Sequence, residues 1–332
     1  MRPALVPLLE HLPGGVLHAA LPTPFPVGPV NCWVLPEQPV TVIDPGMLIP
    51  QSLALVEQLL AEAGLRPRDV DQVVVTHGHP DHVGAAAWLA EQARAPIVCG
   101  RPELPKLVHG FGGDDRARMR LVLEDLGIPE EVRRVMPEMF EAVAPLVGAP
   151  SPSMLRGVSD GDRLLAGGSV LTCLVTPGHA PGHLSLWDPV RRLLFSGDHL
   201  LPRITPNPLI EPDESSRSGR RPSLLEYLET LERFESLGAD TVLPGHGEPF
   251  TDVAQLVAAV RAHHQDRSLL VCELVATMGA PTVYELSQRL FPDLDGMSVV
   301  LGVSEAAGHV DLLVARGQVR PLSGTPVRYA AV

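Results

Sequence analysis

Four apolar runs in this chain each end in a tight turn that carries a histidine or an aspartate. The densest turn spans residues 77–82 and reads HGHPDH, directly after the apolar run 71–76. The other three turns place His179, Asp198 and His246 behind small residues and after further apolar runs. One such turn is commonly just a capped strand end, but four in one chain are hard to ascribe to turn chemistry. Imidazole nitrogens and carboxylate oxygens suit Zn²⁺ and other first-row dications, and α/β enzymes place reactive groups at strand ends. The chain is therefore expected to gather four strand ends around bound metal.

The order of the apolar runs predicts a layered α/β fold with a helical insertion and a helical tail. Strand-like and helix-like segments alternate in the first hundred residues, and strand-like runs return from about residue 170 to 243. Between them, residues from about 101 to 157 carry helical spacing. From about residue 251 the chain reads as helical until a short hairpin near 318–320. We therefore expect a catalytic domain over residues 1–250 that contains the insertion, and a smaller domain over 251–332.

The composition of the chain argues against a nucleic-acid-binding, an exported and a membrane protein. The chain has 332 residues and a net charge of −13, and this acidity disfavours a nonspecific nucleic-acid binder, which needs a basic surface. The four cysteines form no C-x-x-C pair, which favours free thiols in a reducing cytoplasm. No apolar run is judged to reach the length of a membrane span, and prolines interrupt the N-terminal apolar stretch that a signal peptide would need. We expect a cytoplasmic protein with no membrane partner.

Taken together, the turns resemble the motifs of the metallo-β-lactamase superfamily. HxHxDH is found at 77–82, TPGHAPGH at 176–183, SGDHL at 196–200 and PGHG at 244–247. The resemblance covers residues from about 15 to 250 and implies a four-layer αββα sandwich with two divalent metal ions at one edge. It implies one ion held by His77, His79 and His179, a second held by Asp81, His82 and His246, and Asp198 as the bridge. Zinc is the expected metal, with iron or manganese as alternatives.

The resemblance also implies a chemistry and a set of supporting residues. Two dications would lower the pKa of a shared water, so that a metal-bridging hydroxide could attack an acyl or phosphoryl centre. The ligands Asp81 and Asp198 are the candidates for passing the proton onward. Asp44, in the turn at 42–46, is either a group that orients a ligating imidazole or an ordinary turn aspartate. His183 and His199 adjoin ligand positions and are expected behind the ligands or in the pocket.

Fold alone does not identify the substrate. Residues 25–31 and 176–183 resemble the glyoxalase II-like branch, and the segment from 282 to 320 resembles the winged-helix tail of β-lactamase-like hydrolases. We therefore expect hydrolysis of a small ester, thioester or lactone, with the helical insertion as a lid over the substrate. Metal-dependent (endo)ribonuclease or phosphodiesterase action is a second hypothesis, and a non-catalytic metal-binding regulatory module is a third.

The tail carries its own prediction. Residues 281–332 contain five acidic and four basic side chains, whereas duplex binding draws on Lys and Arg to neutralise phosphates. Nucleic acid is therefore not an expected partner, although a helix over 304–315 would be the recognition element of a winged-helix unit. We expect the tail to pack on the hydrolase core or to mediate homo-oligomer formation through its apolar side chains.

Overall fold

The N-terminal part of the chain forms a sheet whose strands lie in sequence order. The computed structural model describes residues 9–109, 114–213, 215–216 and 218–332, so the N-terminal stretch considered above as a signal peptide lies partly outside them. Within this part, the seven-stranded sheet is antiparallel from β1 to β4 and parallel from β4 to β7. Its strands are β1 (Leu9–His11), β2 (Leu17–Leu21), β3 (Val30–Leu35), β4 (Thr41–Ile43), β5 (Gln72–Val74), β6 (Ile97–Gly100) and β7 (Leu155–Val158).

The parallel strands need crossover connections, and short helices supply them. Helix α1 (Pro50–Glu62) links β4 to β5, and α2 (Pro80–Val83) with α3 (Ala86–Ala93) links β5 to β6. Apolar side chains of α1 and α3 pack on the outer face of the sheet, in one cluster with residues of β2 to β6. The described chain also has short 3₁₀ turns at Pro13–Gly15, Pro67–Asp69, Arg101–Glu103, Ala144–Leu146 and Pro152–Met154.

A second sheet of five strands faces the first. Its order is β12-β11-β10-β9-β8, and only the β11–β12 pair is parallel. The strands are β8 (Arg163–Ala166), β9 (Ser169–Val175), β10 (Leu184–Asp188), β11 (Leu193–Gly197) and β12 (Thr241–Pro244). Helix α7 (Ser223–Leu237) connects β11 to β12 and covers the outer face together with α8 (Val253–Met278).

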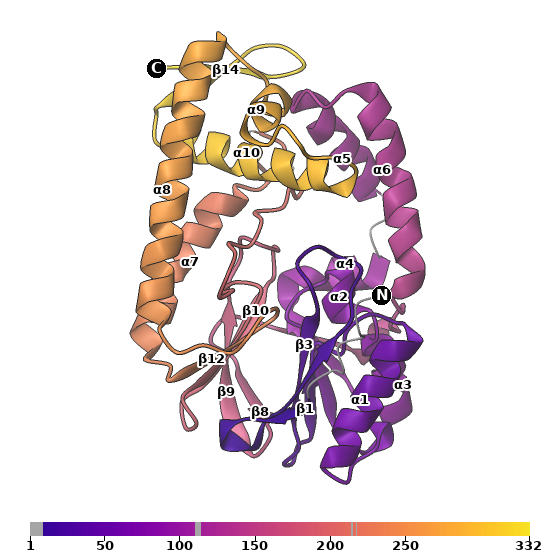
Figure 1. Cartoon of the computed structure of the whole chain (residues 1–332). Coiled ribbons are helices and arrows are strands. Elements are labelled where there is room, and N and C mark those ends of the chain that lie inside the picture. Colours follow the sequence, from indigo (N-terminus) through magenta and orange to yellow (C-terminus); the bar gives the residue numbers. More distant parts are fainter. Residues whose placement is uncertain (1–8, 110–113, 214, 217) are drawn as a thin grey trace, which may run out of the picture.

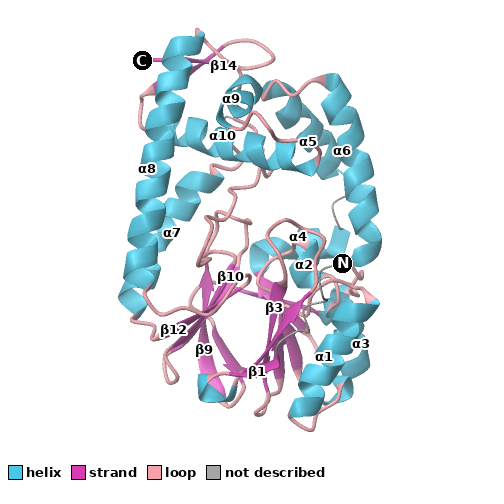
Figure 2. Cartoon of the chain, viewed as in Figure 1, coloured by secondary structure: helices cyan, strands magenta, loops and turns pink. Residues whose placement is uncertain are grey.

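The space between the two sheets is filled by apolar side chains from both inner faces. Trp33, Ile43 and Val74 from the first sheet meet Leu186 and Phe195 from the second in one buried cluster. The Trp33 and Phe195 rings pack edge to face, with centroids 6.4 Å apart, a geometry that adds to the gain from area burial. Helices lie outside both sheets (Figure 2), so the predicted four-layer αββα sandwich is confirmed.

The helical insertion lies at one end of the sandwich, with the tail. It contains α4 (Leu104–His109), α5 (Asp114–Asp125) and α6 (Glu130–Val143), and the tail continues with α9 (Val283–Leu290), α10 (Met297–Ala315), β13 (Val319–Leu322) and β14 (Arg328–Ala331). Figure 1 shows α5 and α6 beside α9 and α10. Leu126 and Ile128 from the insertion share a buried cluster with Val271, Leu286 and Val310 from the tail. The insertion and the tail thus have one common apolar core, while the winged-helix identity of the tail stays a prediction.

Helix α10 corrects one expectation from the sequence. Within the described chain, its window Ser298–Ala315 is long and apolar enough to span a membrane, with a mean hydropathy of 1.4. Helices α8 and α9 meet the same test only as a pair, and they are bent by 117°. The expectation that no run reaches this length was therefore wrong. The physical reason for the apolarity of α10 is internal packing, since 61% of the window is buried inside the protein.

Candidate metal centre

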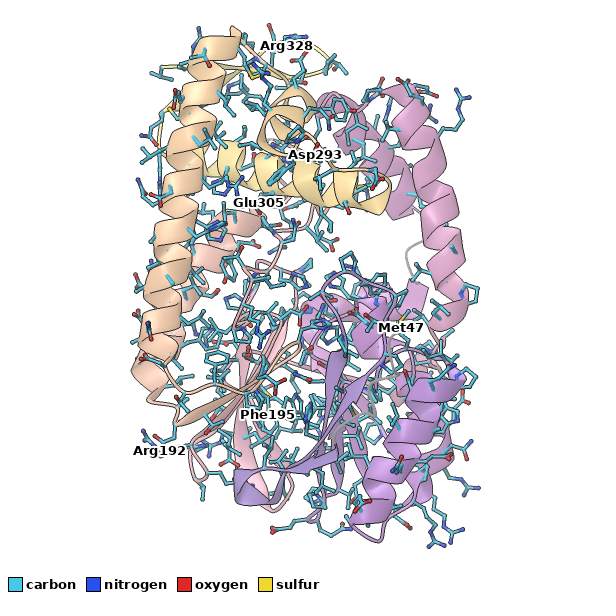
Figure 3. The ribbon with its side chains drawn as sticks, in the orientation of Figure 1. Met47, Arg192, Phe195, Asp293, Glu305 and Arg328 are labelled. Atoms are coloured by element: carbon cyan, nitrogen blue, oxygen red, sulfur yellow. The ribbon has the colours of Figure 1, made fainter. Side chains whose placement is uncertain are left out.

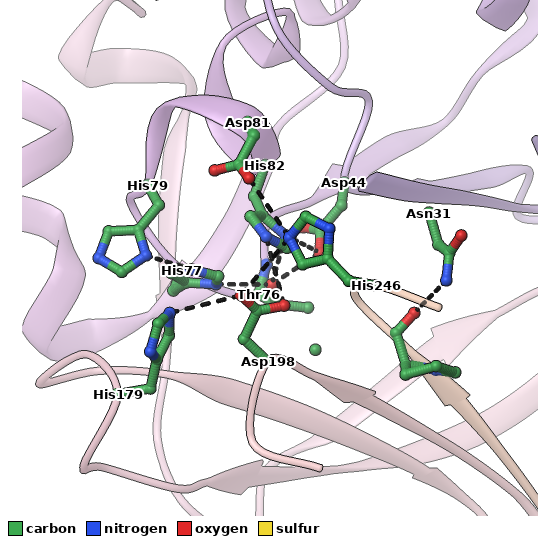
Figure 4. A network of polar contacts seen from close by, with 12 residues as sticks. Asn31, Asp44, Thr76, His77, His79, Asp81, His82, His179, Asp198 and His246 are labelled. Atoms are coloured by element: carbon green, nitrogen blue, oxygen red, sulfur yellow. Dashed lines mark hydrogen bonds and ion pairs between the residues drawn. The ribbon is translucent and has the colours of Figure 1, made fainter. Parts of the chain in front are cut away.

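The four ligand-bearing turns meet at one edge of the sandwich. Strands β9, β11 and β12 run in the same direction, so the turns that follow them emerge together, opposite the turn after β5. Candidate ligand atoms come within 4.8 Å of one another in three overlapping groups. These groups are His77–His79–His179, His77–His82–Asp198 and Asp81–His82–His246. All seven side chains proposed from the sequence as metal ligands are thereby brought into one cluster (Figure 4).

Most imidazoles of the cluster are held from outside it by Nδ1; His79 differs, because its Nδ1 lies 2.7 Å from Nε2 of His77. Nδ1–H of His179 donates to the carbonyl oxygen of Asn207 (3.0 Å), and Nδ1–H of His246 donates to that of Pro29 (2.7 Å). Nδ1 of His77 contacts the Thr76 hydroxyl (3.0 Å). These contacts leave Nε2 of His77, His179 and His246 for the centre of the cluster, the arrangement by which proteins orient metal-binding histidines.

The centre contains buried polar atoms that no protein group satisfies. Nε2 of His82, Nε2 of His179 and Oδ1 of Asp198 are buried without a hydrogen-bond partner. An unsatisfied buried polar atom costs about 1–3 kcal/mol, so these three atoms require a partner that the protein itself does not supply. Nε2 of His82 lies 3.4 Å from Oδ1 of Asp198, and Nε2 of His179 lies 3.4 Å from Oδ2. Neighbouring ligands of one tetrahedral ion with bonds near 2.0–2.1 Å are about 3.3 Å apart, so the donor set and its spacing fit a divalent metal.

The pKa values of the clustered histidines shift in opposite directions. Burial, together with neighbouring imidazoles, holds the pKa of His77 and of His79 well below its ordinary value, so both rings are neutral at pH 7. Burial also opposes the charge of His82, but the carboxylates of Asp198 and Asp44 outweigh it and raise that pKa. Burial likewise disfavours the charged form of Asp198, yet His82 and His246 hold the pKa of Asp198 well below its usual range. Without metal, a proton on His82 therefore balances the negative charge of the nearby carboxylates. A bound cation would displace that proton.

Asp44 lies directly behind His82. Its carboxylate accepts from the Thr76 backbone N–H (2.8 Å), the Thr76 hydroxyl (2.7 Å) and Nδ1–H of His82 (2.8 Å). The side chain is buried, and the residue has a left-handed φ of 52°, a conformation that Asp tolerates better than most residues. Asp44 thus touches a ligating ring and also fixes the residue before His77.

His183 and His199 are buried behind the cluster and do not line its open side. Nε2 of His183 accepts from the backbone N–H of Asp198 (3.0 Å), and its Nδ1 contacts the Thr176 hydroxyl (2.8 Å). His199 lies deeper, against the Tyr227 and Phe234 rings, and burial lowers its pKa to about 3. Of the two positions expected from the sequence, behind the ligands or in the pocket, the structure shows the first.

Glu103 is a site residue that the sequence reading missed. Its buried carboxylate accepts from the backbone N–H of Gly78 (2.9 Å) and from that of Gly182 (2.8 Å). Gly78 belongs to the HGHPDH turn, and Gly182 follows His179 on the facing sheet. A Cβ at position 78 would lie 2.9 Å from Oε2 of Glu103, so only glycine permits this close approach. No spacing or motif marked Glu103, because its partners are backbone groups of distant turns.

Asn31 performs the same task for the fourth turn. Its side-chain amide donates to the carbonyl oxygens of Pro244 (2.9 Å) and Gly247 (2.8 Å), which flank His246. Its own Oδ1 contacts Nε2 of His18 (2.9 Å), so β2 and β3 together fix the turn after β12. Residues 25–31 resemble the glyoxalase II-like branch, but the sequence predicted no role for Asn31.

Comparisons with known proteins agree with this geometry. The family model of the metallo-beta-lactamase superfamily matches residues 25–246. A probable metallo-hydrolase of Bacillus subtilis is 28% identical over 90% of this chain and 92% of its own length. A human protein named acyl-coenzyme A thioesterase is 27% identical over 78% of this chain and 87% of its own. The crystal structure of a metallo-beta-lactamase family protein from Thermus thermophilus superposes with a TM-score of 0.82 at 29% identity, covering 96% of this chain and 99% of that one.

Proposed function

This chain belongs to the metallo-beta-lactamase superfamily, and from this premise we propose that it is a dinuclear metal hydrolase of small acyl substrates, thioesters foremost. The observation that carries the proposal is the position of Asp198. Its two carboxylate oxygens face different histidines, Oδ1 toward His82 and Oδ2 toward His179, each at 3.4 Å. A carboxylate in that position fits a bridge between two ions.

The proposed ligand sets follow from the three groups at the cluster. One ion is assigned to His77, His79 and His179, the other to Asp81, His82 and His246, with Asp198 shared. Zinc is the metal we expect, with iron or manganese as alternatives. When bound, such ions lower the pKa of a coordinated water and polarise the oxygen of an acyl or phosphoryl group.

The residues of the chain supply orientation and proton transfer. Asp44, Asn207 and the Pro29 carbonyl fix the rings whose Nε2 atoms face the centre. His183 fixes the backbone of Asp198, so the bridging carboxylate has little freedom to turn. Asp81 lies with Oδ2 3.3 Å from Nε2 of His246. We assign to Asp81 and Asp198 the uptake of the proton that water loses.

The choice of an acyl substrate rests on two supports. The human relative that aligns with 78% of this chain is named as an acyl-coenzyme A thioesterase, and the net charge of −13 disfavours long polyanions. We further propose that the tail serves packing within the chain and not nucleic-acid binding. From Gly302 to Leu313 every residue of α10 except Asp311 is buried, whereas a recognition helix must expose the face that enters the groove.

A turnover panel on the full-length chain tests the proposal. The protein is stripped with a chelator, reloaded with Zn²⁺ or Mn²⁺, and assayed on an acyl thioester, an aryl ester, a lactone, a bis-nitrophenyl phosphate and single-stranded RNA. We expect thioester turnover to exceed the others and to follow metal content. Faster cleavage of the phosphodiester or RNA would replace the proposal with the nuclease hypothesis. No turnover of any substrate by the metal-loaded protein would favour a binding module.

A further inference from the structure

A second cluster of metal-binding side chains lies away from the edge of the sandwich, where α8 meets α10. His263 and His264 are consecutive on α8, and Glu305 lies on α10 (Figure 3). One candidate ligand atom from each of the three lies within 4.8 Å of the others. Among the described residues this is the only such group outside the active-site cluster.

The cluster contains a donor atom with no partner in the protein. His264 is buried and its Nε2 makes no hydrogen bond. Its Nδ1 lies 3.4 Å from Nε2 of His309. Burial lowers the pKa of His264 to about 4, so the ring is neutral at pH 7 and presents a lone pair. A buried imidazole nitrogen without a partner carries the same cost as those in the active-site cluster.

Glu305 is held in place as metal-binding carboxylates are. Its Oε1 lies 3.3 Å from Nε2 of His309, one helical turn further along α10, and Nδ1 of His309 contacts the Ser268 hydroxyl (3.0 Å). Burial disfavours the charge on Glu305, but the contact with His309 outweighs it and lowers the carboxyl pKa. An ionised carboxylate with a hydrogen-bonded partner behind it is the usual support of a ligand.

Arg267 is a nearby positive charge that opposes the binding of a cation. It acts electrostatically on both His264 and Glu305, and its guanidinium carbon lies 5.0 Å above the centre of the Phe291 ring. Cation–π contact already offsets part of the cost of placing that charge there. The Glu305 carboxylate and the two imidazoles still leave the cluster with donors suited to a first-row dication.

We propose that His263, His264 and Glu305 form a second, structural site for a first-row dication such as Zn²⁺, separate from the active site. His263 is exposed and closes the site from the solvent side, with water as the fourth ligand. Facing helices carry metal sites of this construction in other helical bundles. The ion joins α8 to α10, so it stabilises the contact between these two helices. The inference does not depend on the proposed function.

Zinc titration of the full-length apo protein tests the site, with bound metal counted by elemental analysis and Tm recorded in parallel. His263→Ala is the key variant, because this residue is exposed and its loss leaves the fold intact. We expect His263→Ala and Glu305→Gln to bind one Zn²⁺ fewer per chain than the wild type, and the zinc-induced rise in Tm to shrink. Gln265→Ala, an exposed neighbour on the same helix, is the matched control and should behave as wild type.

The difference between variant and wild type separates this site from the active site. An Asp198→Ala variant should lose metal at the active site and keep the increment that His263→Ala removes. Equal zinc content in His263→Ala and wild type, with affinities within about twofold, would overturn the proposal whatever the active site binds.

Discussion

The active-site cluster and the helical unit, which consists of α5, α6, α9 and α10, hold polar groups in the apolar interior in two different ways. In the active site, side chains such as Asp44, Glu103 and Asn31 bond to backbone or ring atoms from distant turns. In the helical unit, the core shared by the insertion and the tail is apolar, and a buried ion pair joins the loop before α7 to α10. That pair joins Arg220 to Asp311 through two hydrogen bonds of 3.0 and 2.6 Å. A polar change should therefore alter metal binding in the first region and folding stability in the second.

The largest expected effect comes from removing the carboxylate that we propose as the bridge. Asp198→Ala should lower kcat/KM by well over 100-fold, because both ion positions lose a ligand at once. His183→Ala removes only a contact behind the ligand, for which losses of about 10–100-fold are typical. Steady-state kinetics with metal content measured on the same samples distinguishes the two variants. Equal losses would show that Asp198 is not shared between two ions.

The buried ion pair tests the other region. Arg220→Ala leaves Asp311 buried without its partner, and breaking such a pair costs about 3–5 kcal/mol of unfolding free energy. Burial raises the pKa of Asp311 even with Arg220 present. Without Arg220 the carboxyl group should therefore take up a proton, and the loss of unfolding free energy should lie near the lower end of this range. Urea denaturation gives the measurement. Arg221→Ala is the matched control, since its partly exposed pair with Glu226 should contribute no more than about 1 kcal/mol; similar losses in both variants would contradict the assignment.

A change at Glu103 should affect metal binding with little effect on folding. Glu103→Gln places an amide N–H₂ where one of two backbone N–H groups now donates, so the HGHPDH turn and the turn after His179 shift apart. We expect metal affinity to fall by about 10–100-fold, measured by competition with a chromogenic chelator. Glu91→Gln, an exposed position on α3, should leave affinity unchanged. If Glu103→Gln binds metal with the affinity of the wild type, Glu103 does not position the metal-binding turns.

The last prediction concerns the pH dependence of metal affinity. Although burial opposes it, Asp198 raises the pKa of His82 and of His246 above its ordinary value in the metal-free protein. Metal must displace those protons, so affinity is highest above the raised values and weakens as pH falls below them. With two such groups, the logarithm of the affinity should change by up to about two per pH unit. Isothermal titration in buffers of different ionisation enthalpy measures the released protons; affinity independent of pH between 6 and 8 would contradict the shifts.

The same contrast explains what the sequence could and could not predict. The clustering of the seven candidate ligands and the strands that lead to them were predictable, because each turn carries its candidate ligand within a few residues of an apolar run. Glu103 and Asn31 were not, because their partners lie 79 and 213 residues away and are backbone atoms, which every residue has. The helical character of the insertion was predictable from its spacing, but the partner of α5 and α6 was not. Apolar helix faces show that something covers them without showing what.

The shared core of the insertion and the tail has a consequence for how the chain is made. The backbone N–H of Tyr284 donates to the carbonyl oxygen of Leu126 (2.9 Å), so the ends of this contact leave the ribosome roughly 10–30 s apart at ordinary rates of synthesis. Every strand of the sandwich is complete by Pro244, before α9 and α10 exist. During that interval the sandwich can close around its own core while the apolar faces of α5 and α6 stay exposed. The newly made chain therefore passes through a stage that has its ligand turns in place and its helical unit open, and aggregation is most probable at that stage.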